Sequence, residues 1–84
     1  MSEKNTLVVK INNQEYTLAS SASREYMLGV ADIVDKKMKE VSRLNPGLNT
    51  THTAVLAALN VADEYVRLRR EYDMLKKQSS RQHY

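Results

Sequence analysis

Residues 50–78 read TTHTAVLAALNVADEYVRLRREYDMLKKQ, a stretch without Gly or Pro that is rich in Ala, Leu, Arg, Glu and Lys. These residue types favour an α-helix, so we expect one continuous helix over this stretch. Residues 54–62 would make that helix apolar nearly all round, which indicates burial on several sides. Beyond Tyr65 only a narrow apolar stripe remains. The first half is therefore expected to fill a core, and the second half to meet another helix.

The apolar residues of this helix follow a 4-3-4-3-4-3 spacing, which is the a/d pattern of a coiled coil. We call this row the seam; its members are Ala54, Ala58, Val61, Tyr65, Leu68, Tyr72 and Leu75. The last four side chains are large, and a chain this short has no further element to cover them. We therefore expect them to be buried against a second copy of the chain.

Charged residues beside the seam favour parallel pairing of two such helices. With Tyr65 at position a, the two g positions hold Glu64 and Glu71. The two e positions hold Arg69 and Lys76. In a parallel dimer each g residue faces the partner's following e residue, so both couples would join opposite charges. Antiparallel pairing would match g with g and, in some registers, oppose the two glutamates. The pattern therefore predicts a parallel, two-fold dimer.

The N-terminal part of the chain predicts a β-hairpin. Residues 6–11 and 14–19 each alternate apolar and polar side chains, as half-buried strands do. Asn12-Asn13 separates them, and Asn tolerates the positive φ that a two-residue type I′ turn requires. This turn places Val9 opposite Tyr16 on one apolar face. Because a lone hairpin is marginal in water, we expect helices or a partner to cover that face.

Between the hairpin and the long helix, residues 23–44 predict a first helix. Ser20, Ser21 and Ser23 are candidate N-caps for it. Two i,i+4 pairs of favourable orientation, Asp32–Lys36 and Asp35–Lys39, lie on its polar face.

The Asn45-Pro46-Gly47 turn should end this helix, because Pro disfavours helical geometry in the residue before it. Asn49, Thr50 or Thr51 then caps the long helix.

These elements predict an α+β fold of the order ββαα, with a long second helix that ends in a coiled coil, and a dimeric assembly. We divide the chain into four parts. Residues 1–5 are expected to be a disordered N-terminus, and residues 6–62 a globular head that includes the start of the long helix. Residues 63–78 are expected to form the coiled-coil part, and residues 79–84 a frayed tail.

The composition argues against catalysis. The 84 residues include no Cys, only two Gly and two His that are not spaced as metal ligands. The chain has no Gly-rich phosphate loop and no nucleophile motif. It also has no apolar run long enough for a signal peptide or a membrane span. We therefore expect a non-enzymatic cytoplasmic protein with no catalytic residues, metal site or cofactor and no membrane partner.

A net charge of +3 leaves open a DNA-binding alternative of the ribbon-helix-helix type. The basic excess gathers near the end of the long helix, where a solvated face is the ordinary explanation. Only Lys10 on either strand has a side chain that would reach a base edge or phosphate, whereas a reader strand needs several. A protein partner is therefore favoured over nucleic acid. A structural coiled-coil adaptor is a third alternative.

Several blocks of the sequence resemble the cell division protein ZapA family. The strongest similarity covers residues 45–64, which contain the Asn-Pro turn and the block AVLAALNVADE at 54–64. Residues 11–18 resemble the hairpin of the family, and residues 24–38 resemble its first helix. The resemblance extends over about residues 6–76. Asn13 departs from it, since many relatives have Gly there.

This resemblance implies a non-enzymatic partner of FtsZ, the tubulin-like GTPase of bacterial division. Family members crosslink and align FtsZ protofilaments and promote the division ring at mid-cell. The family also dimerises through the long helix and pairs further into tetramers. Our candidate FtsZ contacts are the hairpin turn and exposed basic residues of the head, namely Asn12, Asn13, Gln14, Arg24, Lys36, Lys39 and Arg43.

Overall fold

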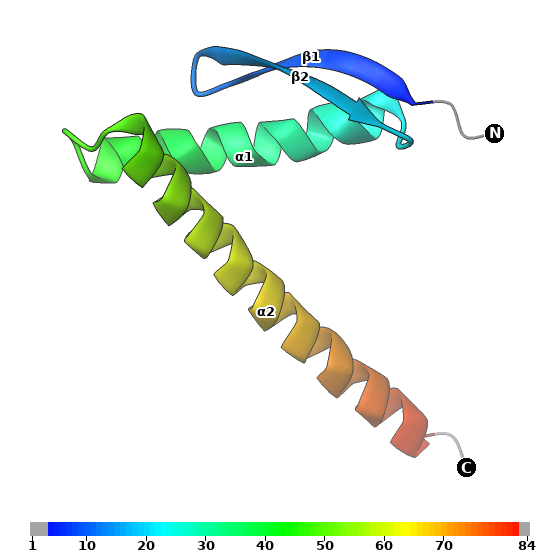
Figure 1. The fold of residues 1–84 in the computed structure, drawn as a ribbon. Coiled ribbons are helices and arrows are strands. Elements are labelled where there is room, and N and C mark those ends of the chain that lie inside the picture. Colours follow the sequence, from blue (N-terminus) through cyan, green and yellow to red (C-terminus); the bar gives the residue numbers. More distant parts are fainter. Residues whose placement is uncertain (1–3, 83–84) are drawn as a thin grey trace.

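In the computed structural model the chain forms a β-hairpin followed by two helices, as predicted (Figure 1). The structure describes residues 4–82. The strands are β1 (Asn5–Ile11) and β2 (Gln14–Ser20), and the helices are α1 (Arg24–Leu44) and α2 (Thr50–Gln82). Asn5 of the expected N-terminal tail opens β1, and residues 79–82 of the expected C-terminal tail continue α2. The remaining ends of the two predicted tails, residues 1–3 and 83–84, lie outside the described residues.

The hairpin has the predicted register. The strands are antiparallel, with Leu7 opposite Leu18 and Val9 opposite Tyr16. Asn12 and Asn13 connect them at φ values of 52° and 68°, the left-handed region that a type I′ turn uses. This two-residue turn keeps Leu7, Val9, Tyr16 and Leu18 on one face of the hairpin.

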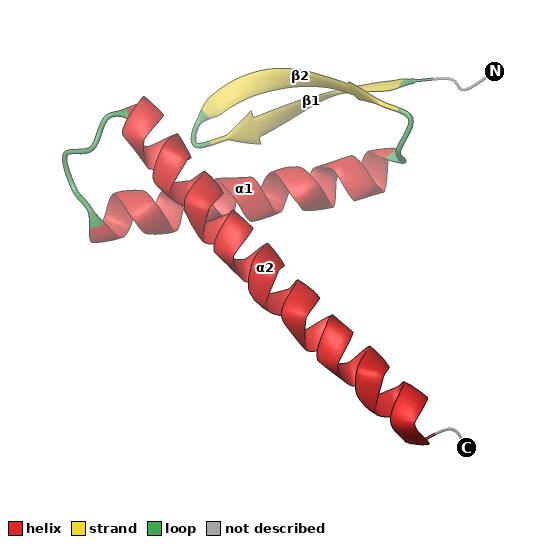
Figure 2. Cartoon of the chain, turned by 60° about the horizontal axis from the view of Figure 1, so that its bottom comes forward, coloured by secondary structure: helices red, strands yellow, loops and turns green. Residues whose placement is uncertain are grey.

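The apolar face of the hairpin lies against α1, which runs alongside both strands (Figure 2). Ser23 caps α1, because its hydroxyl accepts a hydrogen bond from the Tyr26 N–H at 3.1 Å. Two small clusters of buried side chains form the core. Leu7, Val9, Met27 and Ala31 form the one between hairpin and helix, and Met38, Val41 and Ala57 form the one between the helices. Ile11 packs against both clusters and so connects them.

The predicted turn connects the two helices. Gly47 adopts φ 93°, which Gly reaches without steric cost. Of the three candidate caps of α2, Asn49 takes the role, since its side-chain oxygen accepts the His52 N–H at 2.8 Å. Its backbone oxygen also accepts the Thr53 hydroxyl at 2.9 Å, which satisfies the polar group of this buried side chain.

Helix α2 crosses the end of α1 and then projects away from the head (Figures 1 and 2). Its 33 residues span roughly 50 Å at 1.5 Å per residue. The prediction that its first half is buried on several sides is wrong for a single chain. Thr53 and Ala57 are buried, but Val55 and Leu59 are 52% and 60% exposed. Within the described residues, the head of one chain covers one side of α2, which packs mainly on α1.

Candidate partner-binding and self-association surfaces

The hairpin turn contacts α1 through a polar bond. The backbone N–H of Asn12 donates to a carboxylate oxygen of Asp35 at 2.8 Å. The other oxygen of the same carboxylate pairs with the Lys39 ammonium at 2.9 Å. The turn and the basic face of α1 are therefore joined through one acidic side chain.

This environment keeps the Asp35 carboxylate ionised. The Asn12 N–H and then the Lys39 ammonium hold the pKa of Asp35 below its ordinary value of 3.8. The Asp35 side chain is 16% exposed, so most of it is removed from solvent. In the sequence, Asp35 is visible only as an i,i+4 partner of Lys39, because its bond to the hairpin joins residues 23 positions apart.

The basic candidates Lys36, Lys39 and Arg43 are spaced 3 and 4 residues apart on α1, so they share one side of the helix. Lys36 pairs with Asp32 at 2.9 Å, and this hydrogen bond raises the pKa of the lysine. All three residues are exposed. They form a row along α1, and Lys39 in this row lies beside the hairpin turn because both bond to Asp35.

Arg24 lies at the opposite end of α1. Its guanidinium donates to the backbone oxygen of Thr6 in β1 at 2.9 Å. Fifteen residues separate Arg24 from Lys39, which is about 22 Å along a helix. The candidate contacts therefore divide into two sites. One combines Asn12, Asn13 and Gln14 with the basic row, and the other holds Arg24 alone.

The seam residues lie in two different environments along α2. Its first members, Ala54, Ala58, Val61 and Tyr65, line an apolar groove with Val34 and Met38 of α1. Leu68, Tyr72 and Leu75 are not among the residues that line this groove. Tyr65, Leu68, Tyr72 and Leu75 are 60–65% exposed, although their spacing is that of a buried helix interface. A single chain leaves this part of the seam uncovered.

A second apolar row, which sequence analysis did not identify, runs along another side of α2. Val55, Leu59, Ala62 and Val66 follow a 4-3-4 spacing, and the three larger side chains are 43–60% exposed. We call these four residues the outer row. At 100° per residue its three larger side chains lie on the side of α2 opposite Ala57, which packs on α1, whereas Ala62 also borders the groove with α1. The all-round apolar character of residues 54–62 was the sequence signal for it.

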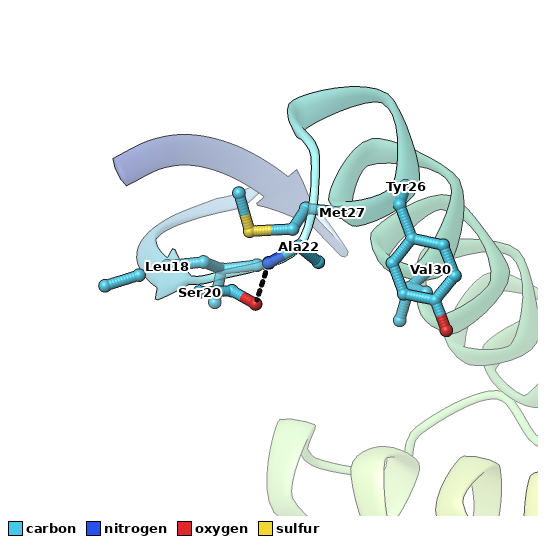
Figure 3. A pocket seen from close by; sticks show the side chains of 7 residues that line it. Leu18, Ser20, Ala22, Tyr26, Met27 and Val30 are labelled. Carbon is cyan, nitrogen blue, oxygen red and sulfur yellow. Dashed lines mark hydrogen bonds between the residues drawn. The ribbon is translucent and has the colours of Figure 1, made fainter. Parts of the chain in front are cut away.

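The head also has an apolar hollow between β2 and α1 (Figure 3). Leu18 of β2 and Met27, Tyr26 and Val30 of α1 line it. Tyr26 and Val30 are 65% and 45% exposed, so the hollow is an apolar surface that a single chain leaves uncovered.

The described residues contain no group of three His, Cys, Asp or Glu side chains that would hold a metal ion. Over the same part of the chain, neither helix combines the length and apolar character that crossing a membrane requires.

The sequence profile described as "Cell division protein ZapA" matches residues 7–83, nearly the whole chain. The chain belongs to the ZapA family of cell division proteins. A ZapA protein from a Geobacillus species is 41% identical over 73 residues, which cover 87% of this chain and 84% of the relative. A ZapA protein from Shouchella clausii is 43% identical over 70 residues, which cover 83% and 90%.

The fold matches a solved structure of the same family. A mutant ZapA dimer from Geobacillus stearothermophilus superimposes with a TM-score of 0.74 at 36% identity, covering 95% of this chain and 93% of that one. The predicted family membership and the predicted ββαα fold are thus confirmed. The comparisons do not test individual contact residues, so the candidate FtsZ contacts stay predictions.

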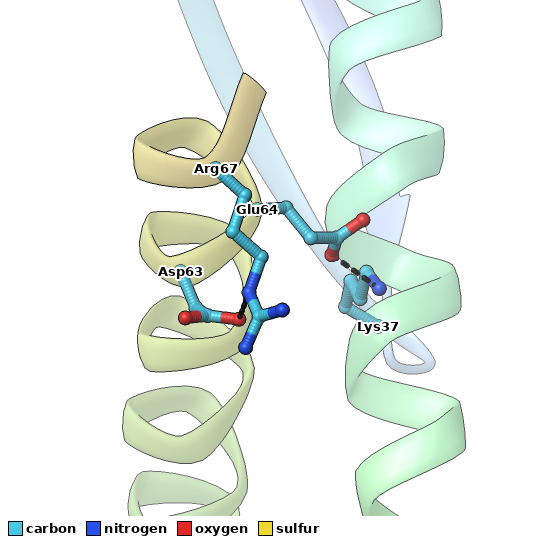
Figure 4. A network of polar contacts seen from close by, with 4 residues as sticks. All are labelled: Lys37, Asp63, Glu64 and Arg67. Atoms are coloured by element: carbon cyan, nitrogen blue, oxygen red, sulfur yellow. Dashed lines mark hydrogen bonds and ion pairs between the residues drawn. The ribbon is translucent and has the colours of Figure 1, made fainter. Parts of the chain in front are cut away.

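Within this ZapA-family chain, two of the predicted interhelix charges, Glu64 (Figure 4) and Arg69, contact other residues of the same chain. Glu64 pairs with Lys37 of α1, which joins the two helices of one chain. Arg69 lies 3.7 Å from Asp73 on the same helix. The couple between Glu64 and Arg69 of two chains would have to compete with these contacts. The predicted pair between Glu71 and Lys76 of two chains stays a prediction. Among the described residues, no ion pair within one chain involves either of these two side chains.

Proposed function

We propose that this ZapA-family chain binds FtsZ and, as a homodimer, crosslinks its protofilaments at the mid-cell division site without catalysing a reaction. The observation that carries this proposal is the uncovered seam on a helix that projects far beyond its own head. Membership of a cell division family and the dimer of the Geobacillus stearothermophilus relative support it.

The seam supplies part of the driving force for dimerisation. Four large apolar side chains contribute about 1.5–3 kcal/mol each when fully buried, or roughly 6–12 kcal/mol per chain. Association itself costs on the order of 4–15 kcal/mol. The seam alone is therefore marginal, and we expect further apolar surface to be buried with it. The outer row and the hollow of Figure 3 are two exposed apolar surfaces that could be buried in this way.

Two apolar rows on one helix allow contacts with two other helices. We assign the seam to the parallel dimer and the outer row to the pairing of dimers into tetramers. Arg67 and Arg70 flank the outer row, so a partner surface with acidic residues at its edges would fit it.

Symmetry turns dimerisation into crosslinking. A two-fold dimer presents each head surface twice, so two filaments are bound at once and the affinity of one contact is reinforced by the other. We assign the contact with FtsZ to the hairpin turn and the adjacent row of Lys36, Lys39 and Arg43. Exposed basic side chains on a rigid head are suited to an acidic protein surface.

Co-pelleting with FtsZ filaments assembled in GTP tests this function. We expect the protein to sediment with the filaments and to increase light scattering through bundling. A folded, dimeric protein that stays in the supernatant would contradict the proposal. Duplex DNA in a parallel assay addresses the DNA-binding alternative, for which we found no supporting observation. Binding that falls steeply with salt, without pelleting, would favour that alternative.

A further inference from the structure

We propose that Asp35 is a positioning residue that fixes the hairpin turn against α1, so that the turn and the basic row form one partner-binding surface. This inference deepens the proposed function and rests on it for the identity of the partner.

Apolar packing stops short of the turn. Ile11, the last residue of β1, packs against both core clusters, and the residues that follow it are Asn12 and Asn13. The side chains at the turn are polar and contribute nothing to the core. Any contact that holds the turn in place on α1 must therefore be polar.

The bond from Asn12 to Asp35 is that contact. In a type I′ turn the internal hydrogen bond runs between the residues on either side of the two central ones, here Ile11 and Gln14. The N–H of Asn12 is left over by this pattern and points to a partner outside the hairpin. It donates to the Asp35 carboxylate oxygen at 2.8 Å. Among the described residues 4–82, no other hydrogen bond joins the turn to a helix. A charged acceptor makes such a bond stronger than a neutral one.

A neighbouring pair on the same helix separates this role from ordinary surface pairing. Asp32–Lys36 and Asp35–Lys39 have the same i,i+4 spacing and the same 2.9 Å length. The Asp32 side chain is 53% exposed, whereas that of Asp35 is 16% exposed and also bonds to the hairpin. Exposed pairs of this kind contribute little to stability. Asp32 is therefore a matched control for Asp35.

Asp35 also determines where Lys39 lies. Because one carboxylate accepts from both Asn12 and Lys39, the ammonium group is held beside the turn. Without Asp35, the backbone of the turn and the side chain of Lys39 would each gain conformational freedom. A partner would then have to order both on binding, which weakens affinity.

The experiment compares Asp35→Ala with Asp32→Ala in the full chain. Amide hydrogen exchange measured by NMR reports on the Asn12 N–H, and co-pelleting with FtsZ filaments reports on binding. For Asp35→Ala we expect about tenfold faster exchange at Asn12, the effect of one lost hydrogen bond, and weaker pelleting. We expect Asp32→Ala to keep the wild-type exchange rate at Asn12, and to weaken pelleting less than Asp35→Ala does, because it frees Lys36 but leaves the turn fixed. Thermal unfolding and sedimentation confirm that the two variants are folded and equal in size.

Asp35→Asn provides a second variant, since its amide oxygen still accepts the Asn12 N–H while the charge is lost. We expect its exchange rate and its pelleting to lie between those of the wild-type protein and Asp35→Ala. If Asp35→Ala does not fold, this variant decides, and wild-type exchange at Asn12 would overturn the proposal. Unchanged exchange in Asp35→Ala, or faster exchange with unchanged pelleting, would overturn it as well. If the wild-type protein fails to pellet, the proposed function fails, and the exchange rates still decide whether Asp35 fixes the turn.

Discussion

Lys37 of α1 pairs with Glu64 of α2 at the place where the two helices diverge (Figure 4). The hydrogen bond to Glu64 raises the pKa of Lys37, so the ammonium group stays charged at neutral pH. Among the described residues, Tyr65, which follows Glu64, is the last residue of α2 to line the groove between the helices. We therefore expect this ion pair to help fix the angle at which the projecting part of α2 leaves the head.

The first prediction concerns this ion pair. Glu64→Gln should lower the thermal unfolding midpoint by no more than about 4 °C, because partly exposed ion pairs contribute little. The same change should broaden the distribution of distances between spin labels on the head and on the end of α2. Asp63→Gln is the matched control, since Asp63 pairs with Arg67 on α2 itself at 2.9 Å. Equal distance distributions in both variants would show that the Lys37–Glu64 pair does not direct α2.

The second prediction tests the seam. Leu68→Glu combined with Leu75→Glu places charge where apolar burial is expected, and sedimentation should show a large loss of dimer while circular dichroism retains the head. Met74→Glu is the control. Met74 is 62% exposed, close to the 65% of Leu75, but it lies about 100° away around α2. Loss of the dimer in both variants would mean that general charge repulsion, not the seam, is responsible.

The third prediction separates the two apolar rows of α2. Leu59→Glu with Val66→Glu should remove tetramers at concentrations where the wild-type protein forms them, and it should leave dimers intact. The reason is that the outer row and the seam lie on different sides of the helix. Light scattering coupled to size-exclusion chromatography gives the masses. Monomers from these substitutions would assign the outer row to the dimer interface instead.

Local sequence signals were sufficient for the secondary structure and the hairpin. The Asn12-Asn13 turn determines the register, because a slip by one residue would move Val9 to the solvent face. Ser23 and Asn49 cap the helices through bonds to residues three positions away. Each of these contacts lies within a few residues of sequence.

Contacts between elements that are distant in the sequence could not be predicted from these local signals. The bond between Asn12 and Asp35 and the pair between Lys37 and Glu64 depend on how the hairpin and α2 lie on α1. A charged residue on a helix surface looks the same in sequence whether or not another element approaches it. For the same reason Arg24 and Lys39 were placed in one group of candidate contacts, with Arg24 favoured, although the fold places them about 22 Å apart along α1.

The fourth prediction uses this separation. Arg24→Glu and Lys39→Glu are the same change of charge at two sites about 22 Å apart on α1. If FtsZ binds the turn and the basic row, Lys39→Glu should weaken co-pelleting several-fold more than Arg24→Glu, with oligomer size unchanged in both. A larger effect of Arg24→Glu would move the contact to the other end of the head. In that case the bond from Arg24 to the Thr6 oxygen would mark the site.

The last prediction concerns acid. The pKa of Asp35 is held below 3.8 in the folded chain by the Asn12 N–H and by Lys39, whereas in the unfolded chain it has its ordinary value. A lowered pKa stabilises the fold above the unfolded value, and this stabilisation is lost as the pH falls through the folded value. The difference in unfolding midpoint between the wild-type protein and Asp35→Asn should therefore be constant from pH 6 to pH 5. It should shrink as the pH falls below about 4. Thermal unfolding at fixed protein concentration measures it, and an equal difference at pH 6 and pH 3 would contradict the assigned ionisation of Asp35.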